Sequence, residues 1–210
     1  MKRKRNILLV WMIILFSSLS AAYAQNAVQL LRKSASALGM NRGVSVSYES
    51  SFFDNRGRGI SSSKGRLDVL GKKFRLQDAV TAVYDGKSLT FYNKEDNTLN
   101  ISSPTSDELA QINPLVLLDQ PDGGFHVFDL PETKLGPVIG LTPKQKSNFS
   151  QIEVCLNREN NLPLYIKVSL TDRSYISIKI MGVVPMPSLA KYSFKIDPKD
   201  YPKAEIIDLR

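Results

Sequence analysis

The chain has 210 residues, of which 42% are hydrophobic and 23% charged, and its formal net charge is +8. A single cysteine excludes an intramolecular disulfide, so the fold must depend on its hydrophobic core. The basic residues beyond the N-terminus are scattered in pairs such as Lys72-Lys73, a pattern that argues against nucleic acid as a partner.

The first 24 residues have the pattern of a cleavable secretory signal. A positive segment, Lys2 to Arg5, precedes an apolar run from Ile7 to Phe16, which is shorter than the roughly 20 residues that span a bilayer. Ala22-Tyr23-Ala24 forms an A-x-A-like cleavage site. We expect cleavage between Ala24 and Gln25, which leaves one domain, residues 25–210, soluble in the periplasm. Since Gln25 and not cysteine follows the cut, we expect no lipid anchor.

An amphipathic helix is expected next. Asn26 can cap its start, and Gly39 suits the left-handed conformation that commonly ends a helix. Apolar residues recur at steps of three and four between them, at Val28, Leu31, Ala35 and Leu38. This apolar side of the helix must pack on another element, most simply a sheet.

Nearly all of the remaining sequence alternates between apolar and polar residues. Asp85-Gly86 is a strong hairpin signal within this pattern. The alternation predicts an antiparallel sheet of about ten to twelve strands, and a sheet of that size must curl or be covered. The clearest apolar series are Val44, Val46 and Tyr48; Leu67 and Val69; Phe74 and Leu76; Leu89 and Phe91; Leu164, Ile166, Val168 and Leu170; and Ile176, Ile178 and Ile180.

Two short helices interrupt the sheet pattern near the middle of the chain. Thr105 and Glu108 form a capping box, and Asn113-Pro114 has the pattern of a second helix start. The second helix, Leu115 to Leu118, is too short and apolar to stand alone in water. We expect the two helices to form a lid over the concave face of the curled sheet.

This succession of elements resembles a known family, the periplasmic lipoprotein carriers or LolA-like proteins. The resemblance extends over almost the whole chain after the signal. The matching segments are Val44–Tyr48, Ser62–Val69 with its glycine, Tyr84–Asn93 with its Asp-Gly hairpin, the lid segment Asn113–Leu118, and Tyr192–Pro198 as the usual last strand.

The resemblance implies an incomplete β-barrel with a helical lid, without catalysis, cofactor or metal. Family members carry lipoproteins from the inner to the outer membrane and hold the acyl chains in the cavity between barrel and lid. The implied partners are these acyl chains, an inner-membrane lipoprotein-releasing transporter and an outer-membrane acceptor. We expect a monomer.

The candidate lipid-binding residues are apolar, because the implied chemistry is shielding. In place of the Arg-Pro pair that locks the lid in the family, this sequence has Lys72-Lys73, so Lys72 is the candidate lid lock. The candidates in the sheet are Phe74, Leu76, Leu89 and Phe91, and those in the lid are Leu109, Ile112, Leu115, Val116 and Leu118.

Two other functions stay open at this point. A carrier of another envelope lipid or glycolipid would have the same fold. An envelope enzyme is disfavoured, because GxSxG, HExxH and CxxC motifs are absent from the sequence. The one histidine, His126, lies in an expected strand, and Cys155 is expected to be a half-buried, unreactive thiol.

Overall fold

The computed structural model describes residues 26–210 except for positions 79, 120, 122 and 187–193. The predicted signal and its cleavage site between Ala24 and Gln25 lie outside the described residues, and both stay predictions. Among the described helices, none combines the length and the apolar character that a membrane crossing requires.

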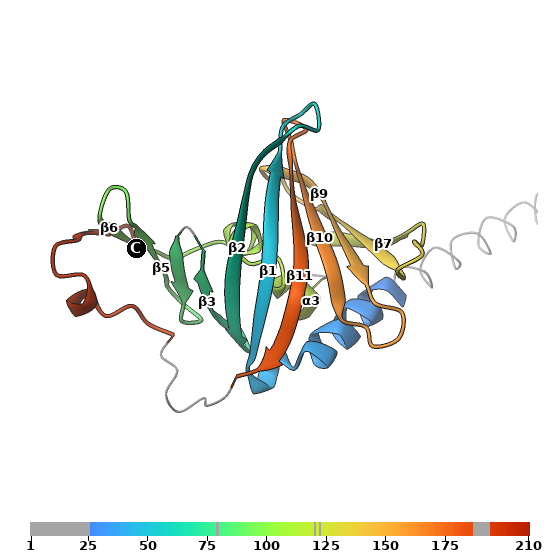
Figure 1. The fold of residues 1–210 in the computed structure, drawn as a ribbon, viewed down its shortest axis with the longest axis horizontal. Helices are drawn as coiled ribbons and strands as arrows, with labels where there is room; N and C mark the ends of the chain where they lie inside the picture. The colour runs from blue at the N-terminus through green and yellow to red at the C-terminus, as the bar shows by residue number, and fades with distance from the viewer. Residues whose placement is uncertain (1–25, 79, 120, 122, 187–193) are drawn as a thin grey trace, which may run out of the picture.

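One twelve-stranded sheet forms the body of the described chain (Figure 1), and it confirms the predicted fold class. Its strand order is β12-β6-β5-β4-β3-β2-β1-β11-β10-β9-β8-β7, so β12 and β7 are its two ends and the barrel is unclosed. All neighbours are antiparallel apart from β12 and β6. The bounds are β1 Val44–Phe53, β2 Gly59–Leu70, β3 Lys73–Gln77, β4 Thr81–Tyr84, β5 Leu89–Asn93, β6 Thr98–Ser102, β7 Phe125–Leu130, β8 Val138–Pro143, β9 Phe149–Leu156, β10 Pro163–Leu170, β11 Tyr175–Pro185 and β12 Glu205–Asp208.

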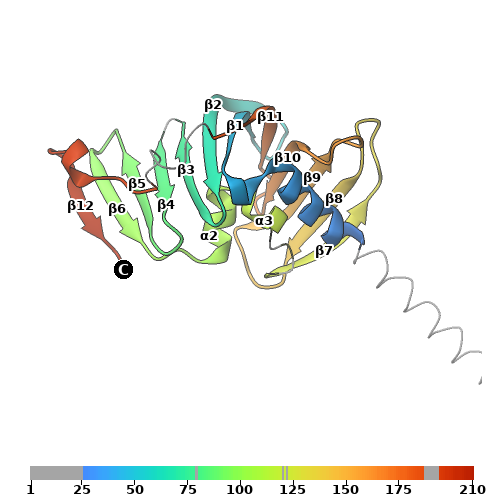
Figure 2. The same cartoon turned by 90° about the horizontal axis from the view of Figure 1, so that it is seen from below.

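The helix over residues 26–38 packs its apolar side on the sheet, as predicted. Leu31 and Leu38 are buried in the same core cluster as Ile139 of β8 and Ile152 of β9. Figure 2 shows the helix beside β7–β10. Gly39 ends it with a φ of 73°, and the short 3-10 helix η1, Met40–Arg42, follows. Asn26 is itself helical, so the prediction that it caps the helix is wrong.

The two lid helices connect β6 with β7, and Figure 2 places them between the two halves of the sheet. In α2, Ser106–Ile112, the capping box is complete: the N–H of Thr105 donates to Glu108, and the N–H of Glu108 donates to the Thr105 hydroxyl. The second helix, α3, spans Val116–Asp119. It begins two residues after Pro114, because Pro114 and Leu115 form a turn whose N–H at Leu115 donates to the Asn113 side chain.

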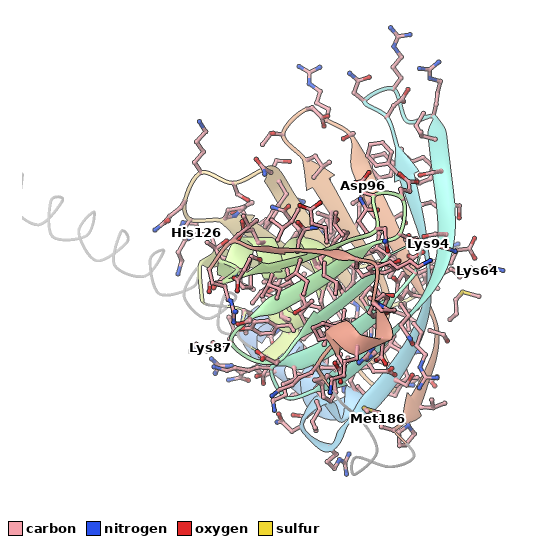
Figure 3. All side chains as sticks on the ribbon, turned by 90° about the vertical axis from the view of Figure 1, so that its left-hand side faces the viewer. Lys64, Lys87, Lys94, Asp96, His126 and Met186 are labelled. Atoms are coloured by element: carbon pink, nitrogen blue, oxygen red, sulfur yellow. The ribbon has the colours of Figure 1, made fainter. Side chains whose placement is uncertain are left out.

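The C-terminal segment differs from the expectation of a last strand over Tyr192–Pro198. Of its described residues, Phe194 to Pro198, none is in a strand. Phe194 instead packs with Val83 of β4 and with Met186, which Figure 3 labels near the lower end of the sheet. A short 3-10 helix, η3, Pro198–Asp200, leads to β12, which pairs in parallel with β6. The final strand is therefore residues 205–208.

Candidate functional site

Two cavities lie between the lid and the sheet. The first, which we call the isoleucine cavity, has a volume of about 160 Å³ and contacts both the lid and the strands on either side of β1. The second, the lysine cavity, measures about 190 Å³ and is lined by residues of both lid helices. The isoleucine cavity is lined by Val46, Tyr48, Ser50, Leu67, Leu76, Gln111, Ile112, Pro114, Leu115, Ile166, Ile176, Ile178 and Ile180. The lysine cavity is lined by Met40, Gly71, Lys72, Tyr84, Ser106, Leu109, Val116, Leu117, Asp119, Gly123 and Phe125.

Strands β10 and β11 supply the apolar wall that gives the isoleucine cavity its name. Ile166 of β10 lies directly opposite Ile178 of β11, and Ile176 and Ile180 follow at the two-residue spacing that keeps side chains on one face. The three β11 isoleucines are only half-buried, although they pack against the core. Their remaining apolar surface is available to a ligand inside the cavity.

Six of the ten predicted site residues line one of these cavities. Leu76, Ile112 and Leu115 line the isoleucine cavity. The other three, Lys72, Leu109 and Val116, line the lysine cavity. The predicted residues of the lid thus divide between the two cavities.

The other four predicted residues lie in or against the packed core. Phe74, Leu89 and Leu118 are buried in it, and Phe91 packs against it half-buried. None of the four is among the residues that line the two described cavities. They fill space beneath the lid rather than bordering the cavities.

The sequence prediction missed the β1, β10 and β11 side of the cavity. Tyr48, Ile166 and Ile178 belong to alternating runs that were visible in the sequence, and Ile178 is 130 positions away from Tyr48 in the numbering. Their alternation with polar residues is the same as that of any residue on the core-facing side of a sheet. The strand order, which places β11 directly beside β1, is the information that the sequence lacked.

A hydrogen-bonded polar cluster adjoins the isoleucine cavity on its β1–β2 side. The hydroxyl of Tyr48 donates to Oδ2 of Asp78 at 3.0 Å, and the hydroxyl of Ser63 donates to the same oxygen at 2.8 Å. Ser50 lies opposite Ser63 in the β1–β2 register, with the two hydroxyl oxygens 2.9 Å apart. Burial, reinforced by the Asp78 carboxylate, raises the pKa of the Tyr48 hydroxyl, which therefore stays protonated and able to donate.

Gly65 makes room for the Tyr48 ring. The two residues are directly opposite each other in the β1–β2 register, and the ring lies over the glycine. A Cβ atom at position 65 would lie 2.5 Å from Cζ of Tyr48. This close approach explains in physical terms why a glycine stands within the strand at this position.

The residues considered for catalysis are placed apart from both cavities. His126 is exposed on β7, and Cys155 is buried in β9 at 0% exposure, with the Thr133 hydroxyl 3.7 Å from its sulfur. The expectation of a half-buried thiol is therefore wrong, because the loop containing Thr133 and Gly136 packs against the end of β9. Within the described ranges, His, Cys, Asp and Glu side chains do not gather in groups of three or more that could hold a metal.

Known proteins provide an independent comparison. The sequence model of the family described as "Outer membrane lipoprotein carrier protein LolA" matches residues 17–135. No curated protein sequence matches the chain.

Solved structures share the fold at low sequence identity. An uncharacterized conserved protein from Thermus thermophilus is 11% identical with a TM-score of 0.51, covering 87% of this chain and 99% of its own. A DUF1329 family protein from Desulfovibrio piger is 9% identical with a TM-score of 0.52, covering 82% and 97%. A putative outer membrane lipoprotein-sorting protein domain from Vibrio parahaemolyticus is 11% identical with a TM-score of 0.49, covering 82% and 97%.

Proposed function

This chain belongs to the family of the outer membrane lipoprotein carrier protein LolA, and on that premise we propose that it carries lipoproteins between the two membranes. In this function it is a binding protein and not an enzyme. It shields the acyl chains of a lipoprotein from water while the cargo passes from the inner to the outer membrane.

The observation that carries this proposal is the isoleucine cavity beneath a lid of two short helices. Its sheet wall is apolar along β10 and β11, and Ile112, Pro114 and Leu115 of the lid close it from the other side. Helices of seven and four residues have little stability of their own in water. A lid built from them is held by its apolar contacts with the sheet, and contacts with an apolar ligand can take their place.

The size of the cavity indicates that the lid moves when cargo binds. A cavity of about 150 Å³ is large enough for one benzene molecule, and the isoleucine cavity measures about 160 Å³. An acyl chain of about 15 methylenes is much larger, and its burial is worth roughly 12 kcal/mol at about 0.8 kcal/mol per methylene. Apolar contacts with the chain replace those that the lid loses when it moves away from the sheet.

The binding residues that we propose follow this geometry. Leu76, Ile112 and Leu115 line the closed cavity together with the β11 isoleucines, and an entering acyl chain contacts them first. Displacement of the lid brings the more deeply placed predicted residues into contact as well: Phe74, Leu89, Phe91, Leu109, Val116 and Leu118.

Lys72 is the proposed lid lock. It follows Gly71 at the turn between β2 and β3 and lines the lysine cavity with Asp119 of α3. An ammonium group is a compact point charge without the planar fork of an arginine, so it holds lid carbonyls and carboxylates less specifically. We therefore expect a lid that opens more readily than one held by arginine.

The location and partners belong to the same proposal. In this proposal, cleavage between Ala24 and Gln25 leaves a periplasmic monomer of residues 25–210. An inner-membrane lipoprotein-releasing transporter supplies the cargo, and an outer-membrane acceptor receives it.

A charge placed in the cavity tests the carrier function. Leu115→Asp puts a carboxylate at a position with 2% exposure in the cavity wall, and Leu135→Asp makes the same change at a leucine with 58% exposure. We expect Leu115→Asp to abolish lipoprotein release from inner-membrane vesicles and Leu135→Asp to leave it intact. Circular dichroism checks that both variants fold. Normal release by a folded Leu115→Asp variant would remove the lid from the mechanism.

The cargo itself is identified by mass spectrometry of lipids that copurify with the protein. Diacyl or triacyl peptides support the lipoprotein carrier. Free glycolipid or isoprenoid species would instead assign the same cavity to a carrier of another envelope lipid.

A further inference from the structure

The sheet wall of the isoleucine cavity has a polar part, and the hydrogen bonds of that part run in one direction. Ile166 of β10, Ile178 of β11 and Ser50 of β1 are successive register partners across the sheet wall of this cavity. Ser50 and Ser63 lie on the inner face of the sheet, whereas the next residue, Lys64, points away from the body of the molecule (Figure 3). The inner face therefore changes from isoleucine to hydroxyl between the neighbouring strands β11 and β1.

The polar cluster fixes the direction of the proton on each hydroxyl. A carboxylate only accepts hydrogen bonds, so the 2.8 Å contact between Ser63 and Asp78 uses the Ser63 proton. Because a hydroxyl has one proton, the 2.9 Å contact between Ser63 and Ser50 must use the Ser50 proton. Ser50 consequently has only lone pairs left to present to the cavity.

The lid supplies the complementary group. Gln111 of α2 lines the same cavity, and its side-chain amide has two N–H donors as well as an acceptor. With the lid closed, a ligand whose polar end offers one donor and one acceptor can satisfy both walls, with its donor on Ser50 and its acceptor on Gln111. Ser50 belongs to β1, so it keeps this role when the lid is displaced. An amide linkage next to an acyl chain has this combination, whereas an ester linkage lacks the donor.

We infer that Ser50, oriented through Ser63 by Asp78, is an acceptor site for the amide N–H of an N-acylated amine whose acyl chain occupies the isoleucine cavity. This inference rests on the proposed function and adds the chemistry of the polar end of the ligand. Ser50 contacts the ligand, and Asp78 is a positioning residue that keeps the Ser50 proton turned away from the cavity.

Two probes that differ by one methyl group on nitrogen test this site. N-decanoylglycine methyl ester has an amide N–H, and N-decanoylsarcosine methyl ester has an N-methyl group in its place. Titration of the purified protein followed by NMR chemical shifts gives a Kd for each probe. We expect wild-type protein to bind the N–H probe roughly 2- to 10-fold more tightly, the ratio that one net hydrogen bond supports.

Three variants test whether the polar cluster is the cause of the difference in Kd between the two probes. Ser50→Ala removes the acceptor. Asp78→Asn places an amide N–H donor beside Ser63, so the Ser63 proton is no longer committed to residue 78 and Ser50 no longer has to donate to Ser63. Both are expected to reduce the ratio to about one. The matched control is Ser51→Ala, since Ser51 lies on the opposite face of β1 and bonds to Ser62; it retains the wild-type ratio.

The outcomes separate this inference from the proposed function. Equal binding of the two probes by wild-type protein, or an unchanged ratio in both Ser50→Ala and Asp78→Asn, overturns the acceptor site and leaves acyl binding standing. If neither probe binds to wild-type protein, the proposed function itself is overturned.

Discussion

Replacing Gly65 by alanine tests the structural basis of the polar cluster. The added Cβ would lie 2.5 Å from Cζ of Tyr48, a separation that real Cβ contacts essentially never show. The backbone of β2 is held at Gly65 by its pairing with β1 and from Arg66 onward also by β3, so the Tyr48 ring must move. Tyr48 is 9% exposed and has little room to turn without losing its 3.0 Å hydrogen bond to Asp78.

The size of the effect follows from three contributions. Loss of a hydrogen bond to a charged group costs about 1.5–3 kcal/mol, and an off-rotamer side chain costs about 0.5–1.5 kcal/mol. Replacing glycine by alanine restricts the unfolded chain, which offsets this loss by about 0.4–1 kcal/mol. We therefore expect Gly65→Ala to lower the free energy of unfolding by about 1–4 kcal/mol.

Urea unfolding of the purified protein, monitored by circular dichroism, measures this change. Gly59→Ala is the matched control on the same strand, because a Cβ there meets Phe53 Cε1 at an ordinary 3.8 Å. That variant is expected to be neutral or more stable by up to about 1 kcal/mol. Equal stabilities for Gly65→Ala and Gly59→Ala would refute the reasoning, because the close approach of Tyr48 is the relevant difference between the two sites.

Three further predictions concern other parts of the fold. Phe194→Ala, which removes a ring with 7% exposure from the outer face, is expected to lower the free energy of unfolding in urea by about 3–5 kcal/mol. A loss below about 0.5 kcal/mol would mean that the C-terminal segment is not anchored there. The N–H of Ser88, followed by that of Lys87, lowers the pKa of the Asp85 carboxyl, so its contribution to stability is present above about pH 4 and is lost as the pH falls through the folded-state pKa. The stability difference between wild type and Asp85→Asn should accordingly shrink between about pH 6 and pH 3, and a constant difference would contradict this assignment. The buried Cys155 thiol is expected to react with Ellman's reagent only when urea unfolds the protein, whereas labelling within seconds in buffer would show that β9 opens in the native state.

Much of the secondary structure could be predicted from local sequence signals. Val44, Val46 and Tyr48 alternate with exposed or polar partners because their strand has one face on the core. The Thr105–Glu108 capping box and the positive φ of Gly39 also depend on residues within a few positions. Such signals act over a single turn or strand and need no knowledge of the tertiary fold.

The last strand was predicted wrongly for a physical reason. Phe194 and Ile196 alternate with polar residues as they would in a strand, but they pack against Val83 and Leu70 on the outer face of the sheet. An extended segment that lies across a sheet has the same period as a strand within it. The Arg75 side chain, which donates to the carbonyl of Lys195 at 2.9 Å, takes part in holding this segment.

The boundary between core and cavity could not be predicted from the sequence either. Phe74 and Leu76 lie on one face of the same short strand, yet Phe74 is in the packed core while Leu76 borders the isoleucine cavity. The difference depends on what lies opposite each side chain. For Leu76 those neighbours include Ile112 of the lid and Ile178 of β11, which the sequence places far from it.

The connections of the lid have a mechanical consequence for the whole sheet. The lid follows β6, next to one end of the sheet, and precedes β7 at the other end. An unclosed sheet has no hydrogen bonds between its ends to fix their separation, so the lid is the covalent link that spans them. A ligand that lifts the lid therefore also changes the constraint on the curvature of the sheet. Fluorophores placed on β7 and β12 would report the size of the bound chain as a change in the distance between the two ends.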